Sequence, residues 1–157
     1  MLVYRLAKEQ WVRDLSGMGA SKFGARWNPE GIPLLYTAEN RALAMTEVAV
    51  HFSIGLMPMN YYMITLEIPE DIRVQSVDDF YSYPEAWQMF PATEFTQRVG
   101  RQFVTVGEAL CLQVPSVVVK GDHNMLINPR HQDMGRVKIT SVVPFPFDRR
   151  LFFDQVD

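Results

Sequence analysis

One carboxylate stands out in an apolar stretch of the sequence. Glu47 is the only charged side chain between Ala42 and His51, among alanine, leucine, methionine, threonine and valine. A carboxylate held near apolar surface is costly unless it has a partner or a chemical use. Helical spacing places Leu43, Glu47 and His51 on one stripe, so Glu47 and His51 either touch or face one cleft. Two interpretations stay open: a structural ion pair or solvated helix edge, and a catalytic carboxylate.

A second candidate is the turn Gly24-Ala25-Arg26-Trp27-Asn28-Pro29, which comes just before an apolar segment. The planar fork of an arginine suits a pyrophosphate, and the neighbouring Gly24 would let backbone N–H groups approach the same oxygens. The alternative is that Arg26 forms a surface salt bridge while Trp27 fills the core. The residues alone do not decide between a phosphate site and this structural role.

A third candidate is Ser116, which follows Pro115 at the start of a very apolar segment. Ser116 has neither a nucleophile-elbow context nor evident His and Asp partners, so a hydrolase triad is not expected. A hydrogen-bonding role for Ser116 in a site and a simple role at the start of a strand remain open. Asn128, further along, is expected to initiate a turn.

The composition limits the classes of partner. The 157 residues carry a formal net charge of −3, and no run of Lys or Arg is longer than Arg149-Arg150. Direct binding to nucleic acid or to an acidic membrane is therefore not expected. His51, His123 and His131 lack the close pairing of a metal site, so we expect no metal.

Nothing in the sequence predicts export or membrane insertion. No apolar stretch approaches the roughly 18 residues of a membrane span, and Met1-Leu2-Val3-Tyr4-Arg5 lacks the basic-then-apolar order of a signal peptide. The single cysteine, Cys111, has apolar neighbours and is expected to be an inert core thiol. We expect a cytoplasmic protein.

The helices that must position these candidates are short. Asn40 is a favourable N-cap for a helix over residues 41–52, which Gly55 and Pro58 would end. A second helix is expected over residues 92–103, with Pro91 at its start.

The other segments are expected to form strands and loops. Residues 17–24, rich in Gly and Ser, are expected to be a loop. Strands are expected, from residue types and alternation, over residues 2–6, 33–37, 61–68, 110–114, 116–119, 125–127 and 137–143.

This order of elements favours an α+β fold. Strands outnumber helices, and after residue 108 the strands follow one another too closely for crossover helices, so antiparallel pairing is expected. Hydrophobic residues make up 48% of the chain, enough for one core, and no repeat or linker is evident. We expect a single domain over residues 1–157.

Four separated stretches together resemble the RES family, which is named for an Arg, a Glu and a Ser. They occur in the family's order and cover most of the chain. They are the turn Gly24 to Asn28 leading through Gly31 and Pro33 to Leu35-Tyr36-Thr37-Ala38, the Glu47 helix ending Val50-His51, the segment at Pro115-Ser116, and Asn124 through Asn128-Pro129-Arg130-His131.

The resemblance implies a fold similar to ADP-ribosyltransferases, with short, mostly antiparallel strands in a split sheet and a few flanking helices. It carries the family's Arg, Tyr, Glu and Ser onto Arg26, Tyr36, Glu47 and Ser116. Glu47, Arg26 and Ser116 are then the expected catalytic residues. Arg26, Tyr36, Ser116 and Gly24 are expected to bind NAD, which is the substrate.

The resemblance also implies a biological role. Known members are toxins of bacterial type II toxin–antitoxin pairs that act on NAD by hydrolysis, phosphorolysis or ADP-ribosyl transfer to a protein. The implied partner is a helix-turn-helix antitoxin of the Xre or ParS-like type, which blocks the active site and supplies the DNA binding. This division of labour agrees with the acidic charge of the chain.

The implied chemistry suits a site with one carboxylate. Nicotinamide leaves NAD as a neutral molecule, so its departure needs no general acid, unlike most glycoside hydrolysis. A carboxylate beside the ribose stabilises the oxocarbenium-like transition state. The leading hypothesis is an NAD glycohydrolase or phosphorylase that arrests growth. The alternatives are ADP-ribosylation of a specific protein, and a non-catalytic binding module in which Glu47 and Arg26 merely pair.

Overall fold

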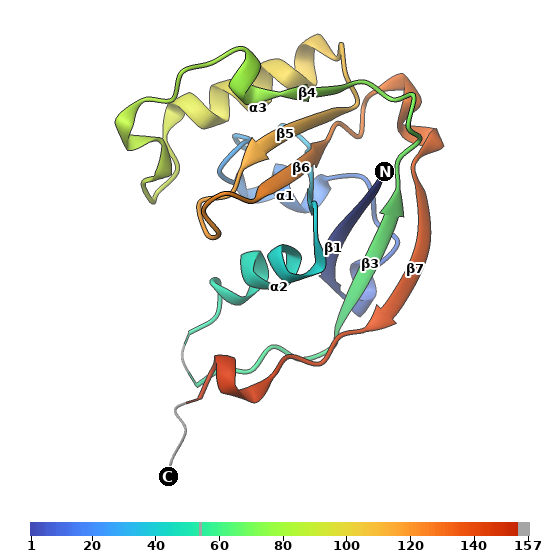
Figure 1. Cartoon of the computed structure of the whole chain (residues 1–157), viewed down its shortest axis with the longest axis vertical. Coiled ribbons are helices and arrows are strands. Elements are labelled where there is room, and N and C mark those ends of the chain that lie inside the picture. The colour runs from blue at the N-terminus through green and yellow to red at the C-terminus, as the bar shows by residue number, and fades with distance from the viewer. Residues whose placement is uncertain (54, 154–157) are drawn as a thin grey trace.

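A computed structural model describes residues 1–53 and 55–153 and confirms the α+β fold (Figure 1). The expected domain over 1–157 also includes Ile54 and residues 154–157, which lie outside the described part. The strands are β1 (Leu2–Lys8), β2 (Leu35–Ala38), β3 (Tyr61–Glu67), β4 (Val74–Ser76), β5 (Cys111–Pro115), β6 (His123–Ile127) and β7 (Lys138–Pro144). The helices are α1 (Met18–Phe23), α2 (Arg41–Ala49) and α3 (Glu94–Val106), with short 3-10 turns η1 (Glu9–Trp11), η2 (Val77–Asp79), η3 (Glu85–Gln88), η4 (Gln132–Arg136) and η5 (Arg149–Leu151).

The strands form one sheet that is narrow in the middle. Their order is β4-β5-β6-β2-β1-β3-β7, and every neighbouring pair except β4 with β5 is antiparallel. The central pair, β1 with β2, is joined only at Tyr4 and Ala38, whereas β1 pairs with β3 along its whole length. Helix α2 lies in the angle between the two halves (Figure 1). The sheet is continuous in its hydrogen bonding, but it is split in shape.

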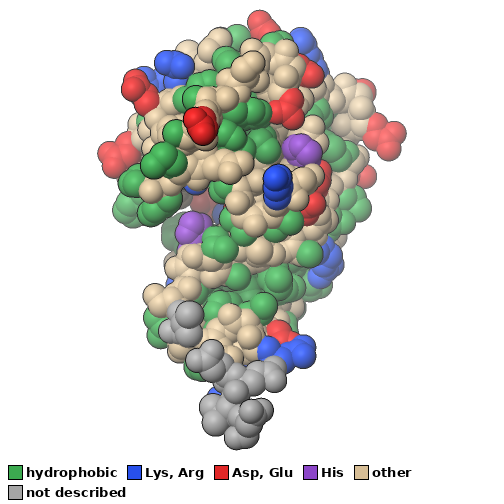
Figure 2. All heavy atoms as spheres, turned by 60° about the vertical axis from the view of Figure 1, so that its left-hand side comes forward, with side chains coloured by type: hydrophobic (Ala, Val, Ile, Leu, Met, Phe, Trp, Pro, Cys, Tyr) green, Lys and Arg blue, Asp and Glu red, His purple; other side chains and the backbone are tan. Residues whose placement is uncertain are grey.

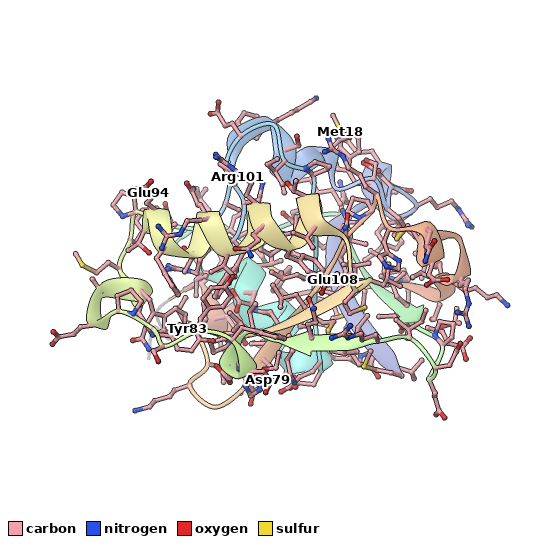
Figure 3. The ribbon with its side chains drawn as sticks, turned by 90° about the horizontal axis from the view of Figure 1, so that it is seen from above. Met18, Asp79, Tyr83, Glu94, Arg101 and Glu108 are labelled. Carbon is pink, nitrogen blue, oxygen red and sulfur yellow. The ribbon has the colours of Figure 1, made fainter. Side chains whose placement is uncertain are left out.

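Helix α3 covers the half of the sheet that contains β5 and β6. Its residues Val99 and Phe103 pack against Leu112 of β5 and Leu126 of β6 in one buried cluster. Figure 3 shows α3 from above, lying along strands β4 and β5. The other half of the sheet has its own apolar layers, including an aromatic group around Phe147 and Phe152 that supports α2 from below.

The expected loop over residues 17–24 is wrong, because this segment contains helix α1. Gly17 and Gly24 bound the helix with positive φ angles of 68° and 67°. The Gly24 N–H donates to the Ala20 carbonyl at 2.9 Å and so closes the last turn. The glycines that suggested a loop are therefore the two ends of a short helix.

Helix α2 begins as expected and ends earlier than expected. The Asn40 side chain accepts a hydrogen bond from the Leu43 N–H at 2.8 Å, which confirms the N-cap. The helix ends at Ala49, not at residue 52. The N–H groups of His51 and Phe52 bond to carbonyls three residues back, so the chain tightens into turns before Gly55.

The strand expected over residues 116–119 is also wrong, since β5 ends at Pro115. The Ser116 hydroxyl accepts hydrogen bonds from the N–H groups of Val118 and Val119, both at 3.0 Å. A side chain that caps its own backbone in this way makes a turn in place of a strand. Strand β4, three residues that pair in parallel with β5, was not predicted from the sequence.

Helix α3 is displaced from the expected 92–103. It starts at Glu94 after Thr93 and continues to Val106, where Gly107 adopts a left-handed conformation with φ of 65°. Glycine in that conformation is a common helix end, because it has no Cβ to clash.

Candidate active site

A cavity of about 790 Å³ opens where the two halves of the sheet part. It is lined by residues from α1 and the following turn, from β1, β2 and α2, from α3 and the segment before it, and from β5, β6 and their connection. Figure 2 shows a hollow in the molecular surface bordered by hydrophobic side chains. The volume lies within the range of pockets that bind small molecules and cofactors.

Glu47 projects into this cavity from helix α2. Leu43, one turn earlier, is buried at 1% exposure, and it anchors the same face of the helix in the core. The Glu47 carboxylate accepts hydrogen bonds from the Ser116 hydroxyl at 2.8 Å and from the Asn124 amide at 2.5 Å. Both donors reach the same oxygen, Oε1. Glu47 is therefore a held carboxylate and not a freely solvated helix edge.

The hydrogen bonds of Ser116 direct its proton to Glu47. Ser116 is 5% exposed, and its oxygen accepts from two backbone N–H groups, which leaves the hydroxyl hydrogen for the carboxylate. The structure contains the hydrogen bond that one of the two roles considered for Ser116 requires, and its part in a functional site stays a prediction. The other role, at the start of a strand, is wrong.

Arg26 lines the same cavity. Its Nη1 donates to the carbonyls of Trp87 and Met89 at 3.0 and 3.1 Å. Within residues 1–53 and 55–153 it makes no salt bridge, so the surface ion pair considered as the alternative has no partner among the described residues. Burial lowers the pKa of Arg26, and the negative charge of Glu47 opposes this effect. Trp27 is 2% exposed and fills the core, as one interpretation expected.

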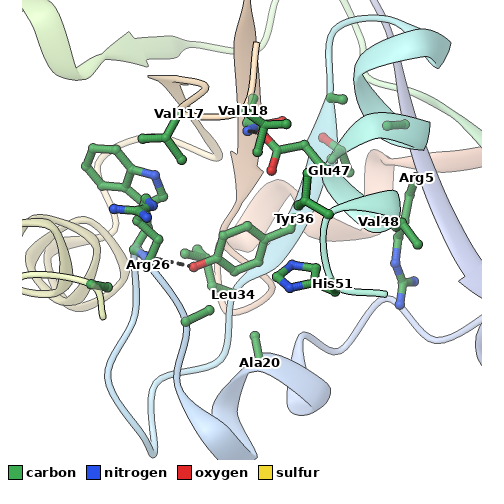
Figure 4. Close-up of a pocket in the computed structure, with 18 of the residues that line it drawn as sticks. Arg5, Ala20, Arg26, Leu34, Tyr36, Glu47, Val48, His51, Val117 and Val118 are labelled. Carbon is green, nitrogen blue, oxygen red and sulfur yellow. Dashed lines mark hydrogen bonds between the residues drawn. The ribbon is translucent and has the colours of Figure 1, made fainter. Parts of the chain in front are cut away.

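Tyr36 is fixed from both sides by the turn that carries Arg26. Its hydroxyl donates to the Asn28 side chain at 2.8 Å and accepts from the Trp27 N–H at 3.0 Å. Burial raises the pKa of Tyr36, so its hydroxyl is neutral at physiological pH. Figure 4 shows the Tyr36 ring between Arg26 on one side and His51 on the other, with Glu47 above it.

Gly24 also lines the cavity, but its own N–H is already bonded to the Ala20 carbonyl. A Cβ at this position would lie 3.3 Å from the Asn28 carbonyl oxygen, in a backbone conformation that favours glycine. Gly24 therefore contributes space and chain direction to the cavity, and its own N–H is not available to an anion.

Several residues of the cavity were not identified from the sequence as site residues. Asn124 bonds to Glu47, and Arg5 lines the cavity while its Nη1 donates to the Asp14 carbonyl at 2.6 Å. Asn124 lies within one of the stretches that resemble the RES family, but its contact with Glu47 depends on strand pairing. His51 lines the same cavity as Glu47, which confirms the expectation that the two face one cleft.

The part of the chain that the structure describes contains no group of three or more His, Cys, Asp or Glu side chains that could hold a metal ion. The expected absence of a metal stays a prediction. Among the same residues, no helix is both long enough and apolar enough to span a membrane.

Comparison with known proteins decides the family. The family model described as RES domain matches residues 2–148. The chain belongs to the RES family. A curated relative from a Sphingobium strain, named Prs ADP-ribosylating toxin, is 36% identical to this RES chain over 139 residues, covering 88% of this chain and 86% of the relative. A relative from Yersinia enterocolitica, named Toxin Res, is 32% identical and covers 96% and 99% of the two chains.

A solved structure shares the fold of this RES chain. It is a crystal structure of the MbcT–MbcA toxin–antitoxin complex of M. tuberculosis, with a TM-score of 0.64 and 21% identity. The likeness covers 96% of this chain and 86% of that one. The RES fold thus extends over nearly the whole chain.

Proposed function

We propose that this protein is the toxin of a bacterial type II toxin–antitoxin pair and that it cleaves the nicotinamide–ribose bond of NAD. The observation that carries the proposal is the placement of a held carboxylate, Glu47, and an arginine, Arg26, in one cavity. Membership of the RES family and the toxin names of the relatives support it. The loss of NAD would arrest growth.

In this reaction the bond between ribose C1′ and the pyridinium nitrogen breaks, and the bonding electrons leave with nicotinamide. Positive charge then moves onto the ribose, where Glu47 would stabilise it. An acceptor adds to C1′ and loses a proton, with water giving ADP-ribose and phosphate giving its phosphate ester. The leaving group departs neutral, so one carboxylate suffices.

The other proposed site residues would bind NAD. Arg26 would hold the pyrophosphate with the nitrogens that face the cavity, because only its Nη1 has acceptors among the described residues. Tyr36, whose ring lies beside Arg26 and below Glu47 in Figure 4, would orient the nicotinamide end. Gly24 would leave room for the dinucleotide, and Ser116 would act through Glu47.

A second candidate function is ADP-ribosyl transfer to a specific protein, which shares the same bond cleavage. Two observations favour it, of which the first is that the relative with 36% identity is named as an ADP-ribosylating toxin. Two phenylalanines that line the cavity, Phe23 and Phe90, are 82% and 87% exposed, and such apolar surface suits contact with a protein acceptor. Radiolabelled NAD distinguishes the candidates, since transfer leaves label on protein.

The proposal includes a partner and a place in the cell. The solved structural neighbour is a toxin–antitoxin complex. We propose that a helix-turn-helix antitoxin covers the cavity of this chain and that the pair acts in the cytoplasm, where NAD is available. We also propose that residues 1–157 form a single RES domain.

The contacts of Glu47 and Arg26 argue against the binding-module alternative. It required Glu47 and Arg26 to pair, but Arg26 bonds to the carbonyls of Trp87 and Met89, while Glu47 bonds to Ser116 and Asn124.

The first experiment is incubation of the purified protein with NAD, with and without phosphate, while nicotinamide is followed by mass spectrometry. Glu47→Ala is expected to reduce release about a thousandfold, since a charge pair at about 4 Å and effective dielectric 20 contributes roughly 4 kcal/mol. Glu70→Ala, at an exposed position away from the cavity, is the control. Equal release by wild type and Glu47→Ala, or none by wild type, would contradict the proposal.

A further inference from the structure

Both side-chain donors that bind Glu47 reach a single oxygen. The Ser116 hydroxyl and the Asn124 amide bond to Oε1 at 2.8 and 2.5 Å, and among the described residues Oε2 has no partner. The carboxylate is thus divided into a fixed oxygen and an open one. The open oxygen is the one available to a ligand in the cavity.

The position of Asn124 is determined by strand pairing. On β6 it lies opposite Ala38 of β2 and Val114 of β5, so it is paired on both sides of its strand. The start of β6 is also bonded to the start of α2. The Asn40 amide donates to the Asp122 carboxylate at 3.0 Å, which links the residue just before the helix to the residue just before the strand.

A second link runs between the same two segments. The His123 N–H donates to the Glu39 carboxylate at 3.0 Å, and the Glu39 N–H donates to the His123 carbonyl at 3.3 Å. The helix that carries Glu47 and the strand that carries Asn124 therefore form one fixed unit. This is the arrangement expected where a reacting group must be held to within a fraction of an ångström.

We infer that Asn124 is a positioning residue for the reaction: with Ser116 it fixes Oε1 of Glu47 and turns Oε2 toward the ribose. The kinetic test of this inference rests on the proposed function. A second test, the position of Glu47 in variant structures, does not depend on that function. Ser116 alone would leave the carboxylate free to rotate about its single hydrogen bond. Two donors on one oxygen, from different segments, remove that freedom.

The kinetic test compares nicotinamide release by wild type and Asn124→Ala. We expect kcat to fall about ten- to a hundredfold, the range for a hydrogen bond to a charged group, while KM changes little. Asn124→Ala and Ser116→Ala should combine with less than additive effect, since both act on one oxygen. A rise in KM with unchanged kcat would overturn the inference, because Asn124 would then contribute only to substrate binding.

Asn124→Asp gives a sharper readout, because it keeps the shape and removes the donor. At neutral pH the introduced carboxylate would repel Glu47, and the hydrogen bond from residue 124 to Glu47 would be lost. At acid pH the introduced carboxyl group binds a proton and can donate this hydrogen bond again. We expect the ratio of variant to wild-type kcat to rise as pH falls. The other titratable groups that line the cavity are common to both proteins and cancel in this ratio; they are Tyr4, Arg5, Arg26, Tyr36 and His51.

Asn128→Asp is the matched control. Asn128 directly follows β6, is 1% exposed, and donates to the Val104 carbonyl at 3.3 Å without touching Glu47. The same substitution there should leave kcat of the folded protein unchanged at every pH. A pH-independent loss in Asn124→Asp equal to that in Asn128→Asp would indicate a structural role only and would overturn the inference.

Crystal structures of the variants supply a test that needs no turnover. In Asn124→Ala we expect Glu47 to leave its position beside Ser116, and in Asn128→Asp we expect it to stay. If Glu47 keeps its position in Asn124→Ala, the inference is wrong. If wild type releases no nicotinamide, the proposed function fails, and the position of Glu47 still decides the role of Asn124.

Discussion

At the scale of single residues, the partners of a side chain decide what it can do. Glu47 and Arg26 are oppositely charged and line one cavity, yet each forms its hydrogen bonds with other groups: Glu47 with Ser116 and Asn124, and Arg26 with backbone carbonyls. Arg26 is bound by neutral carbonyls, which hold it without neutralising its charge. Such a guanidinium keeps its attraction for an anion, and this makes a pyrophosphate contact a testable role.

Arg26→Lys tests whether the guanidinium fork matters. Lysine keeps the positive charge but cannot bond bidentately, so we expect KM for NAD to rise about tenfold, equivalent to roughly 1.4 kcal/mol, with a smaller change in kcat. Initial rates over a range of NAD concentrations measure both constants. Arg41→Lys, at the exposed start of α2, should behave as wild type. An unchanged KM in Arg26→Lys would refute the pyrophosphate role.

At the scale of elements, each helix has a separate task. Helix α2 carries Glu47 between the halves of the sheet, and its start is bonded to the start of β6. Helix α3 contributes no charged side chain to the cavity. It packs so closely on the turn that carries Arg26 that a Cβ on Gly100 would overlap the Trp27 carbonyl oxygen. The turn is therefore supported from behind by α3.

Gly100→Ala should disturb that support. The clash involves backbone on both sides, so α3 or the Arg26 turn must shift, and overpacking of this kind typically costs about 1–3 kcal/mol. We expect a lower midpoint of urea unfolding together with weaker NAD binding. Gly19→Ala in α1, where an added Cβ meets nothing within 4 Å, is the control and should be neutral or slightly stabilising. Equal midpoints for the two variants would show that the packing at Gly100 tolerates a methyl group.

At the scale of the whole molecule, the apolar core around β5 and β6 is sealed from solvent. Cys111 lies on β5, is fully buried, and has a thiol pKa that burial raises to about 12. This agrees with the expectation of an inert core thiol. A thiol reagent attacks the thiolate, so in the folded protein Cys111 lacks both access and charge.

A thiol reagent should therefore label Cys111 only when the sheet opens. At urea concentrations below the unfolding transition, we expect the rate of Cys111 labelling at pH 8 to be orders of magnitude lower than in the unfolded chain. Through the transition this labelling rate should rise in parallel with the unfolded fraction. The raised pKa of Cys111 also makes the stability depend on pH. Above about pH 9 the thiol loses its proton in the unfolded chain and keeps it in the folded chain, so the free energy of unfolding falls as the pH rises toward 12. Cys111→Ser should remove the labelling, and fast labelling of native protein would contradict this account.

The sequence by itself determined features that depend on neighbouring residues. The N-cap at Asn40, strand β3 (expected over residues 61–68 and observed over Tyr61–Glu67) and the apolar face behind Glu47 follow from local hydrogen bonding and side-chain shape. The resemblance of four stretches to the RES family is confirmed as well, since the RES domain model matches residues 2–148. Local patterns failed where glycines bound helix α1, and where Ser116 caps a turn that resembles a strand in composition.

Only the tertiary structure decided how the site is assembled. Ser116 and Asn124 reach Glu47 across 69 and 77 residues of sequence, and Arg26 finds its carbonyl acceptors 61 and 63 residues away. These contacts depend on the pairing of β6 with β2 and β5 and on the narrow join between the halves of the sheet. Strand register is fixed by packing and hydrogen bonding over the whole sheet, so no local pattern contains it.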